Sequence, residues 1–386
     1  MIVVVGAGPA GIAAALRAQE CGARVTVVDD NPAPGGQIWR GDSNVWLTRF
    51  RASGIPFIAS ARVITGDAQA QTLLVETPEG ARKLTWDKLI IAAGSRELFL
   101  PFPGWTLPGV FGAGGLQALA KSGLSVADKT VVIGGTGPLL LAVAAYLRQH
   151  GAHVKLIAEQ ASPAGLAGFA KELLRNPNKL LQGVALARHI AGSPYVTNCW
   201  IESATGQGRL EAVTLRQGRR TWTERCDFAA IGYGLVPDNE LATFLMNSPN
   251  VVIAGTGELN LAILEGEIAG FTVAGYPERA LGLYGKREKA HRFATALQHT
   301  FALRHELKSL PRPDTIVCRC EDVTFGLLCE FPNSRAAKLH TRCGMGPCQG
   351  RICGPAAEFL FGWNPGSLRP PLFPAKIGSL MPATTE

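Results

Sequence analysis

The first part of the chain takes its fold from the stretch Ile2-Val3-Val4-Val5-Gly6-Ala7-Gly8-Pro9-Ala10-Gly11. Its four β-branched residues predict a short strand, and the glycines predict a turn into an alanine-rich helix that runs to about Glu20. A second strand follows from Arg24 to Val28. Two strands joined by a crossover helix pair in parallel, so the sequence predicts a parallel sheet covered by helices.

The glycines of this turn match G-x-G-x-x-G directly after a strand and at the start of a helix, as dinucleotide binding requires. The first glycine permits the turn, the second lets a pyrophosphate approach the backbone, and the third lets helix and strand pack closely. The helix N-terminus offers unpaired N–H groups to the phosphates. Asp29, at the end of the second strand, is placed to accept hydrogen bonds from a ribose. We predict a dinucleotide site at Gly6, Gly8, Pro9, Ala10, Gly11 and Asp29.

A second unit of the same kind begins at Thr130–Ile133, with a helix near 139–150 and a strand at 153–157. Its turn repeats two glycines, Gly135 and Gly137, but Leu140 stands where the third glycine belongs. The bulk of Leu140 opposes the close helix–strand contact that the motif needs. The occupant stays open: NAD, ATP, or no nucleotide in a domain that serves packing.

The rest of the chain is organised around these two units. Pro101, Pro103 and Pro108 mark a crossing between domains, and residues 274–310 are predicted to be a polar, helical linker. The other predicted segments are a turn-rich region at 31–60, strands at 61–65, 71–77, 88–92 and 251–254, several strands from 179 to about 231, and a helix at 259–273.

Five of the nine cysteines lie close to the C-terminus: Cys318, Cys320, Cys343, Cys348 and Cys353. Such clustering favours metal ligation over disulfides in a chain with no export signal. Four thiolates in two close pairs satisfy a [2Fe–2S] cluster, and the glycines near Cys343 allow a loop to fold around inorganic sulfide. Zinc is the competing occupant, although C-x-C paired with C-x₄-C is not typical of zinc sites. The even spacing of the last three cysteines leaves Cys353 open as an alternative ligand.

Composition limits the function classes. Hydrophobic residues make up 47% and charged ones 18%, as expected for a well-buried enzyme of two or three domains. The net charge is +8, but the basic residues are scattered along the sequence and do not form the basic stripe of a nucleic-acid-binding protein. Glycines and a proline interrupt the longest apolar stretch, 131–147, so no transmembrane segment is expected. No signal peptide precedes the first strand, which predicts a cytoplasmic location.

On these motifs the chain resembles the flavoproteins with two dinucleotide-binding domains, the superfamily of glutathione reductase and thioredoxin reductase. Pro32–Gln37 is similar to that family's loop after the second strand, and Ile90–Gly94 is similar to its A-T-G segment. The resemblance implies that the first dinucleotide is FAD. It adds Gly35, Gly36, Gln37, Val63, Ala93, Gly94 and Gly255 as contacts, with Glu258 in the place of the family's acidic residue.

The cysteine segment resembles the bacterioferritin-associated-ferredoxin-like [2Fe–2S] domain, and this resemblance implies Cys318, Cys320, Cys343 and Cys348 as cluster ligands. The whole combination resembles the flavoprotein subunit of the opine oxidase, D-hydroxyproline dehydrogenase and hydrogen cyanide synthase type. Two loops are shorter than in that family, after Gly255 and between Cys320 and Cys343. Either the loops are contracted or residues are missing from the chain as given.

The resemblance implies a glutathione-reductase-like α/β fold with a small C-terminal [2Fe–2S] domain. We expect a discontinuous FAD domain at 1–105 and 245–300, a second nucleotide domain at 106–244, and the cluster domain and tail at 310–386. The expected function is electron transfer from a catalytic flavoprotein partner, which oxidises an amine or amino acid, to an unidentified acceptor. The sequence offers no convincing catalytic acid–base set. The alternatives are a self-sufficient NAD(P)H-dependent reductase and a scaffold subunit with a structural cluster.

Overall fold

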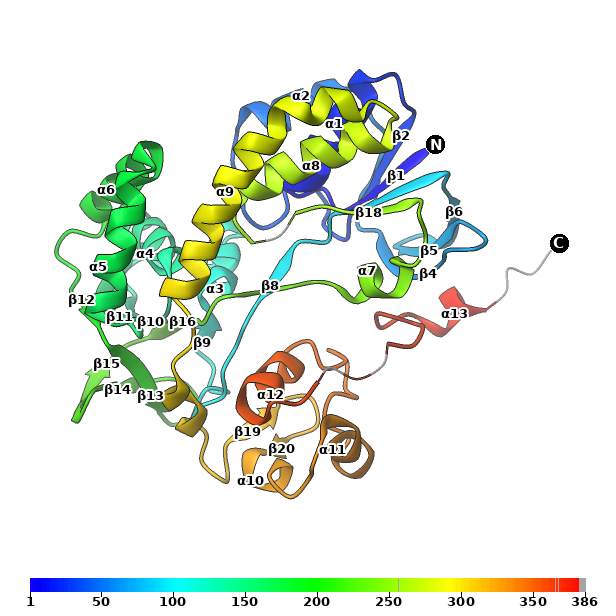
Figure 1. Ribbon diagram of the computed structural model, residues 1–386. Helices are drawn as coiled ribbons and strands as arrows, with labels where there is room; N and C mark the ends of the chain where they lie inside the picture. The colour runs from blue at the N-terminus through cyan, green and yellow to red at the C-terminus, as the bar shows by residue number, and fades with distance from the viewer. Residues whose placement is uncertain (256, 365, 367, 382–386) are drawn as a thin grey trace. The chain divides into compact units, whose positions relative to one another are not determined.

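The computed structural model describes residues 1–255, 257–364, 366 and 368–381 (Figure 1). The chain folds as two compact units. The first consists of Met1–Arg96, Val236–Ala294 and the described part of 367–386. The second consists of Glu97–Leu235 and the described part of Thr295–Gly366. The chain passes between them within β8 (Ser95–Glu97), at β17 (Leu235–Pro237) and within α9 (Leu281–Thr300).

A parallel sheet with strand order β18-β7-β1-β2-β3 forms the base of the first unit. Helices α1 and α8 lie side by side (Figure 1) because small residues line their contact. A Cβ at Gly266 would lie 2.1 Å from the Ala10 carbonyl oxygen, so only glycine permits this approach. The elements are β1 (Ile2–Val5), α1 (Pro9–Glu20), β2 (Val25–Val28), β3 (Phe57–Ile58), β7 (Lys88–Ile91), β18 (Val251–Ile253) and α8 (Leu259–Val273).

An antiparallel sheet of β4 (Arg62–Asp67), β5 (Thr72–Thr77) and β6 (Gly80–Thr85) completes the first unit. Its inner face forms a core with β1 and β7, and Leu372 of the tail joins that core. Glu76 of β5 accepts hydrogen bonds from the Lys376 amide and the Ser379 hydroxyl. The remaining elements are α2 (Val45–Ala52), α7 (Glu240–Leu245), η1 (Pro277–Ala280) and α13 (Ile377–Leu380).

The second unit repeats the parallel architecture, with strand order β12-β11-β10-β16-β9. The strands are apolar at nearly every position because helices and a second sheet cover them. The elements are β9 (Val110–Gly112), α3 (Ala113–Lys121), β10 (Thr130–Gly135), α4 (Pro138–Gln149), β11 (His153–Glu159), α5 (Pro163–Leu174), α6 (Pro177–His189), β12 (Tyr195–Thr197) and β16 (Phe228–Gly232).

The covering sheet of the second unit is antiparallel and consists of β13 (Cys199–Thr205), β14 (Ala212–Gln217) and β15 (Arg220–Arg225). The cysteine segment follows η2 (His305–Ser309) and has a small core of its own, which includes Val317, Leu328 and Trp363. Its elements are β19 (Ile316–Cys318), β20 (Val323–Thr324), α10 (Phe325–Leu328), α11 (Ser334–Thr341) and α12 (Cys353–Phe361).

The predicted α/β fold with two Rossmann-like units is confirmed, and α8 has the predicted limits. The prediction of strands from residue 179 is wrong for 179–189, where α6 lies. Region 31–60, predicted to be turn-rich, contains α2, whose first amides donate to the Asn44 side chain. The strand β6 was also missed. No helix within the described ranges is long and apolar enough to cross a membrane.

Candidate cofactor sites

The first glycine turn joins β1 to α1 at the carboxyl edge of the first parallel sheet. Gly6 has a positive φ of 101°, and a Cβ there would lie 2.2 Å from the Ala92 carbonyl oxygen. A Cβ at Gly11 would lie 1.8 Å from the Gly6 carbonyl oxygen. A Cβ at Gly8, by contrast, would meet no atom within 4 Å. The first and third glycines are therefore required by the fold, whereas the second leaves space over the backbone.

Asp29 is buried at the end of β2 and accepts a hydrogen bond from the Ala7 amide with one carboxylate oxygen. Its other oxygen accepts from the Asn31 amide and from Asn31 Nδ2, both at 2.7 Å. Arg40 Nη2 donates to Asn31 Oδ1 at 2.8 Å. The chain Arg40–Asn31–Asp29 fixes the carboxylate beside the glycine turn. Asn31 and Arg40 were not predicted from the sequence, because neither belongs to a motif.

The predicted loop after β2 lies against the glycine turn. The Gly35 amide donates to the Ala7 carbonyl at 2.8 Å, and a Cβ at Gly36 would lie 3.1 Å from the Gly8 Cα. Both glycines have positive φ. Gln37 is exposed beside them. This loop and the turn therefore make up one continuous surface at the carboxyl ends of β1 and β2.

The other predicted FAD contacts lie at different depths. Ala93 and Gly94 follow β7 and are exposed, whereas Val63 of β4 is buried in the core. Gly255 follows β18, and a Cβ there would lie 2.5 Å from the Ala10 Cβ. Thr256, next in the chain, lies outside the described residues.

Glu258, predicted as a stand-in for the family's acidic FAD contact, caps the N-terminus of α8. Its carboxylate accepts a hydrogen bond from the Leu261 amide at 2.9 Å. Glu265, which the sequence did not single out, accepts from the Gly255 amide at 3.1 Å. Both carboxylates therefore stabilise the short connection after β18.

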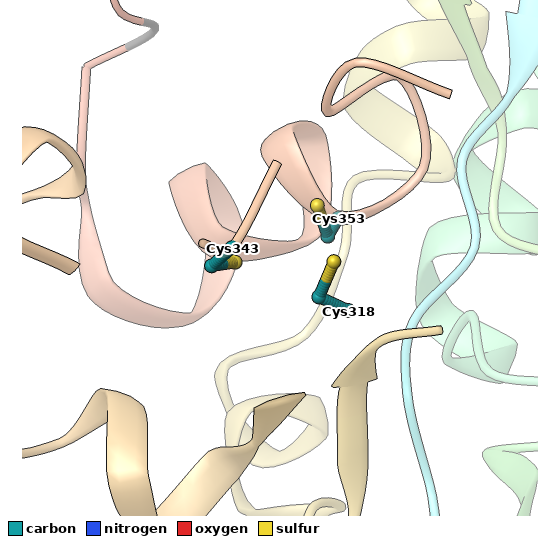
Figure 2. A group of neighbouring side chains, drawn as sticks. All are labelled: Cys318, Cys343 and Cys353. Carbon is teal, nitrogen blue, oxygen red and sulfur yellow. The ribbon is translucent and has the colours of Figure 1, made fainter. Parts of the chain in front are cut away.

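The five C-terminal cysteines converge in the second unit. The sulfur atoms of Cys318, Cys343 and Cys353 all lie within 4.8 Å of one another (Figure 2). The Cys353 thiol also forms a hydrogen bond with Cys348, whose thiol in turn bonds to Cys320. Cys353 therefore neighbours the Cys318, Cys343 and Cys348 thiols.

Backbone amides are aimed at two of these sulfurs. Hydrogen bonds from the Cys343 and Cys353 thiols, assisted by the Gly344 and Glu321 amides, lower the pKa of Cys318 to about 2. A hydrogen bond from Cys353, with amide bonds from Ile352 and Gly350, lowers the pKa of Cys348 to about 5. Sharing a proton with Cys318 raises the pKa of Cys343 to about 12. Cys318 and Cys348 are thus stabilised as thiolates, the form that binds metal, whereas hydrogen bonds to the neighbouring thiols raise the pKa of Cys353.

A cavity of about 310 Å³ opens beside this group and is lined on one side by Cys318, Cys320, Cys348 and Cys353. Phe99, Trp105 and Phe111 also line this cavity. A Cβ at Gly346 would lie 2.3 Å from the Cys320 Cβ, so the loop closes around Cys320 only with glycine there. Converging soft ligands, bonded amides and adjoining space together fit an iron–sulfur cluster.

The second glycine turn joins β10 to α4. Leu140, in the place of the third glycine, is fully buried in the core of its domain. A Cβ at Gly232 would lie 3.3 Å from Leu140 Cδ2, so the glycine at the end of β16 makes room for the leucine. The Rossmann-like fold is thus kept without the third glycine of the motif.

The chain is similar in sequence and in fold to several known proteins. Residues 1–253 match the pyridine nucleotide-disulphide oxidoreductase family. An opine oxidase subunit from Rhizobium meliloti (strain 1021) is 31% identical over 98% of this chain and 97% of its own length. The hydrogen cyanide synthase subunit HcnB of Pseudomonas protegens is 29% identical over 91% of this chain and 89% of its own length. The fold is similar to that of L-proline dehydrogenase from P. horikoshii, with a TM-score of 0.66, 17% identity, and coverage of 99% of this chain and 79% of that one.

Proposed function

We infer the function from the family and from the two candidate cofactor sites. The chain belongs to the pyridine nucleotide-disulphide oxidoreductase family, is related to the opine oxidase subunit, and is an FAD-dependent oxidoreductase. It would be the electron-transfer subunit of a multimeric amine or amino-acid dehydrogenase. The substrate class would be of the opine or D-hydroxyproline type. A catalytic flavoprotein partner would oxidise the amine. Electrons would then pass through a [2Fe–2S] cluster and the FAD of this chain to an acceptor.

One observation carries this proposal: a single chain combines an open glycine turn with a convergent group of five thiols. Bound FAD supplies the ability to accept two electrons and release them singly, and an iron–sulfur cluster supplies a one-electron carrier. These are the two capacities that an electron-transfer protein needs between a two-electron substrate and a one-electron acceptor.

The chain's own residues would hold both groups. The space over Gly8 leaves room for a pyrophosphate, and the first amides of α1 would donate to it. Asp29, fixed by Asn31, would accept from the adenosine ribose. The predicted contacts from Pro9 and Ala10 would position the flavin nucleotide at the start of α1, while Gly35 and Gly36 would lie along it.

Four of the five thiolates would ligate the cluster. Cys318, Cys320 and Cys348 belong to the set predicted from the sequence, which also named Cys343. We infer that Cys353 would replace Cys343 as the fourth ligand, because Cys353 lines the cavity with the first three, whereas Cys343 lies within 4.8 Å of Cys318 and Cys353 but does not line it. Exposure of Cys320 would bring one side of the cluster near the surface for exchange of electrons.

The test is anaerobic reduction of the chain alone and of the complex purified with its natural partners. Secondary amines and D-amino acids should bleach the flavin and produce the electron paramagnetic resonance signal of a reduced cluster in the complex, and should do neither with the chain alone. Amine oxidation by the isolated chain would contradict the proposal, because it would place the catalytic site here. If the cluster stays oxidised while the complex turns over, the role of the cluster is structural and not electron transfer.

A further inference from the structure

The second glycine turn is covered by a segment of the same chain that lies far away in the sequence. Phe301, just after α9, lies over Gly137, and a Cβ built on that glycine would be 3.8 Å from the Phe301 ring. We infer that Phe301–Arg304 fills the position where a dinucleotide would place its pyrophosphate, so that this nucleotide-binding fold serves as the docking site for the linker to the cysteine segment. The inference depends on the second unit alone and not on the proposed function.

The two glycine turns of the chain provide an internal comparison. The second glycine of the motif lacks a side chain so that the pyrophosphate can approach the backbone, and a Cβ built there points to where the phosphates lie. At Gly8 a Cβ would meet no other part of the chain within 4 Å, whereas at Gly137 it meets an aromatic ring. Phe169 of α5 packs edge-on against Phe301 with ring centroids 5.6 Å apart, which holds the ring in place.

The hydrogen-bond donors of the second turn are also used internally. The Gly137 amide donates to Glu159 Oε2 at 2.7 Å, and the Thr136 hydroxyl donates to Glu159 Oε1 at 2.7 Å. Glu159 has no exposed surface. A phosphate at this turn would have to displace both donors from a buried carboxyl group, and the turn therefore offers an anion little.

Gln160, the residue after Glu159, fastens the linker by polar contacts. Its side-chain amide donates to the Ala302 carbonyl at 3.1 Å and accepts from the Arg304 amide at 3.2 Å. Gln160 is fully buried, so both contacts are shielded from water. Each polar atom of the Gln160 amide therefore has a partner within the linker.

Arg304 extends the docking along the covering sheet. Its guanidinium carbon lies 5.4 Å from the Trp200 ring centroid, and its Nη1 donates to the side chain of Asn198. Further along, Leu307 and Leu310 enter the hydrophobic core that includes Trp200. The Trp105 indole then donates to the Ile316 carbonyl at 2.6 Å, directly before Cys318. Contacts with the second unit thus run along the linker from the second glycine turn to the residues just before Cys318, the first predicted cluster ligand.

Two consequences follow. The unsubstituted chain should bind neither NADH nor NADPH, and its flavin should not be reduced by either. The Phe301 contact should protect the linker, so that loss of the ring exposes the amides of 301–304 and of the turn at 135–137.

The experiment uses the full chain with its bound cofactors. Titration calorimetry and anaerobic absorbance with NADH and with NADPH should show no saturable binding and no bleaching. Hydrogen exchange followed by mass spectrometry on F301A should show exchange at 301–304 and 135–137 about tenfold faster or more, as expected for the loss of a partly buried aromatic contact. F228A is the matched control, because Phe228 is also half-buried but lies at the opposite end of β16 from the glycine turn.

F301L provides the same readout if the alanine variant does not fold, with a smaller increase in exchange. Saturable binding of either nicotinamide nucleotide to the unsubstituted chain would overturn the inference. So would exchange rates at 301–304 and 135–137 that rise no more in F301A than in F228A.

Discussion

At the scale of single residues, the glycines of the first turn fall into two classes with opposite consequences for substitution. Gly11 approaches the Gly6 carbonyl so closely that any side chain there would overlap it and destabilise the fold. Gly8 has an extended backbone with φ of −77° and open space around it. The fold therefore has no need of a glycine at position 8, and a bound pyrophosphate provides the reason for one.

We expect G8A to fold normally and to lose FAD affinity by about tenfold or more, equivalent to about 1.4 kcal/mol. G11A should instead lower the thermal stability of the apoprotein, because its Cβ would overlap the Gly6 oxygen. Flavin titration and thermal denaturation of the two apoproteins separate these effects. A destabilised G8A apoprotein, or one that binds FAD as tightly as the unsubstituted chain, would contradict this account of the turn.

The thiols allow a second test at this scale. We expect C353S to lose most of its iron, because the Cys353 sulfur contacts three of the other four thiols. C343S should retain its iron, since Cys343 does not line the cavity. Iron and acid-labile sulfide per chain measure both. The opposite result would support the ligand set predicted from the sequence, Cys318, Cys320, Cys343 and Cys348.

At the scale of elements, α1 and α8 pack through small residues on both helices. We expect G266A to cost about 1–3 kcal/mol of stability, because the added Cβ would meet the Ala10 carbonyl at 2.1 Å. G285A in α9 is the control, since a Cβ there meets nothing within 4 Å and alanine favours a helix by about 1 kcal/mol over glycine. Denaturant unfolding compares the two. Equal stability of the variants would show that α8 does not need this close approach.

An ion-pair group joins β8 to the start of α7. Arg96 contacts Asp238 at 3.0 Å and Glu240 at 2.8 Å, and hydrogen bonds from these neighbours outweigh burial and lower the pKa of Glu240 to about 2. A carboxyl group with a lowered pKa stabilises the fold above its ordinary pKa, and this contribution is lost as the pH falls toward 2. E240Q should therefore melt at a lower temperature than the unsubstituted chain at pH 7, by a difference that narrows toward pH 3. A difference that is constant over this range would exclude the ion pair as its cause.

The elements also show what the sequence could predict. β1, α1, β10 and α4 were predicted because their apolar strands and glycine turns are local signals. Helix α6 was missed, and none of its residues is buried in the structure. The glycine turn and the cysteines of the sites were predicted from motifs. Asn31, Arg40, Glu265 and Phe301 were not, because their roles depend on contacts that only the folded chain creates.

At the scale of the whole molecule, the chain combines two nucleotide-binding folds that differ in use. The first has an open turn and a carboxylate fixed beside it. The second has its turn covered by the linker that leads to the thiol group. This division favours a protein that receives electrons from a partner protein over one that receives them from a nicotinamide nucleotide.

The amount of flavin, iron and acid-labile sulfide per chain, measured on protein purified anaerobically, tests whether the chain holds both FAD and a [2Fe–2S] cluster. One flavin with two irons and two sulfides, as a [2Fe–2S] cluster requires, is the expected result. Zinc in place of iron, or flavin without sulfide, would contradict the cluster assignment and with it the proposed route of electrons.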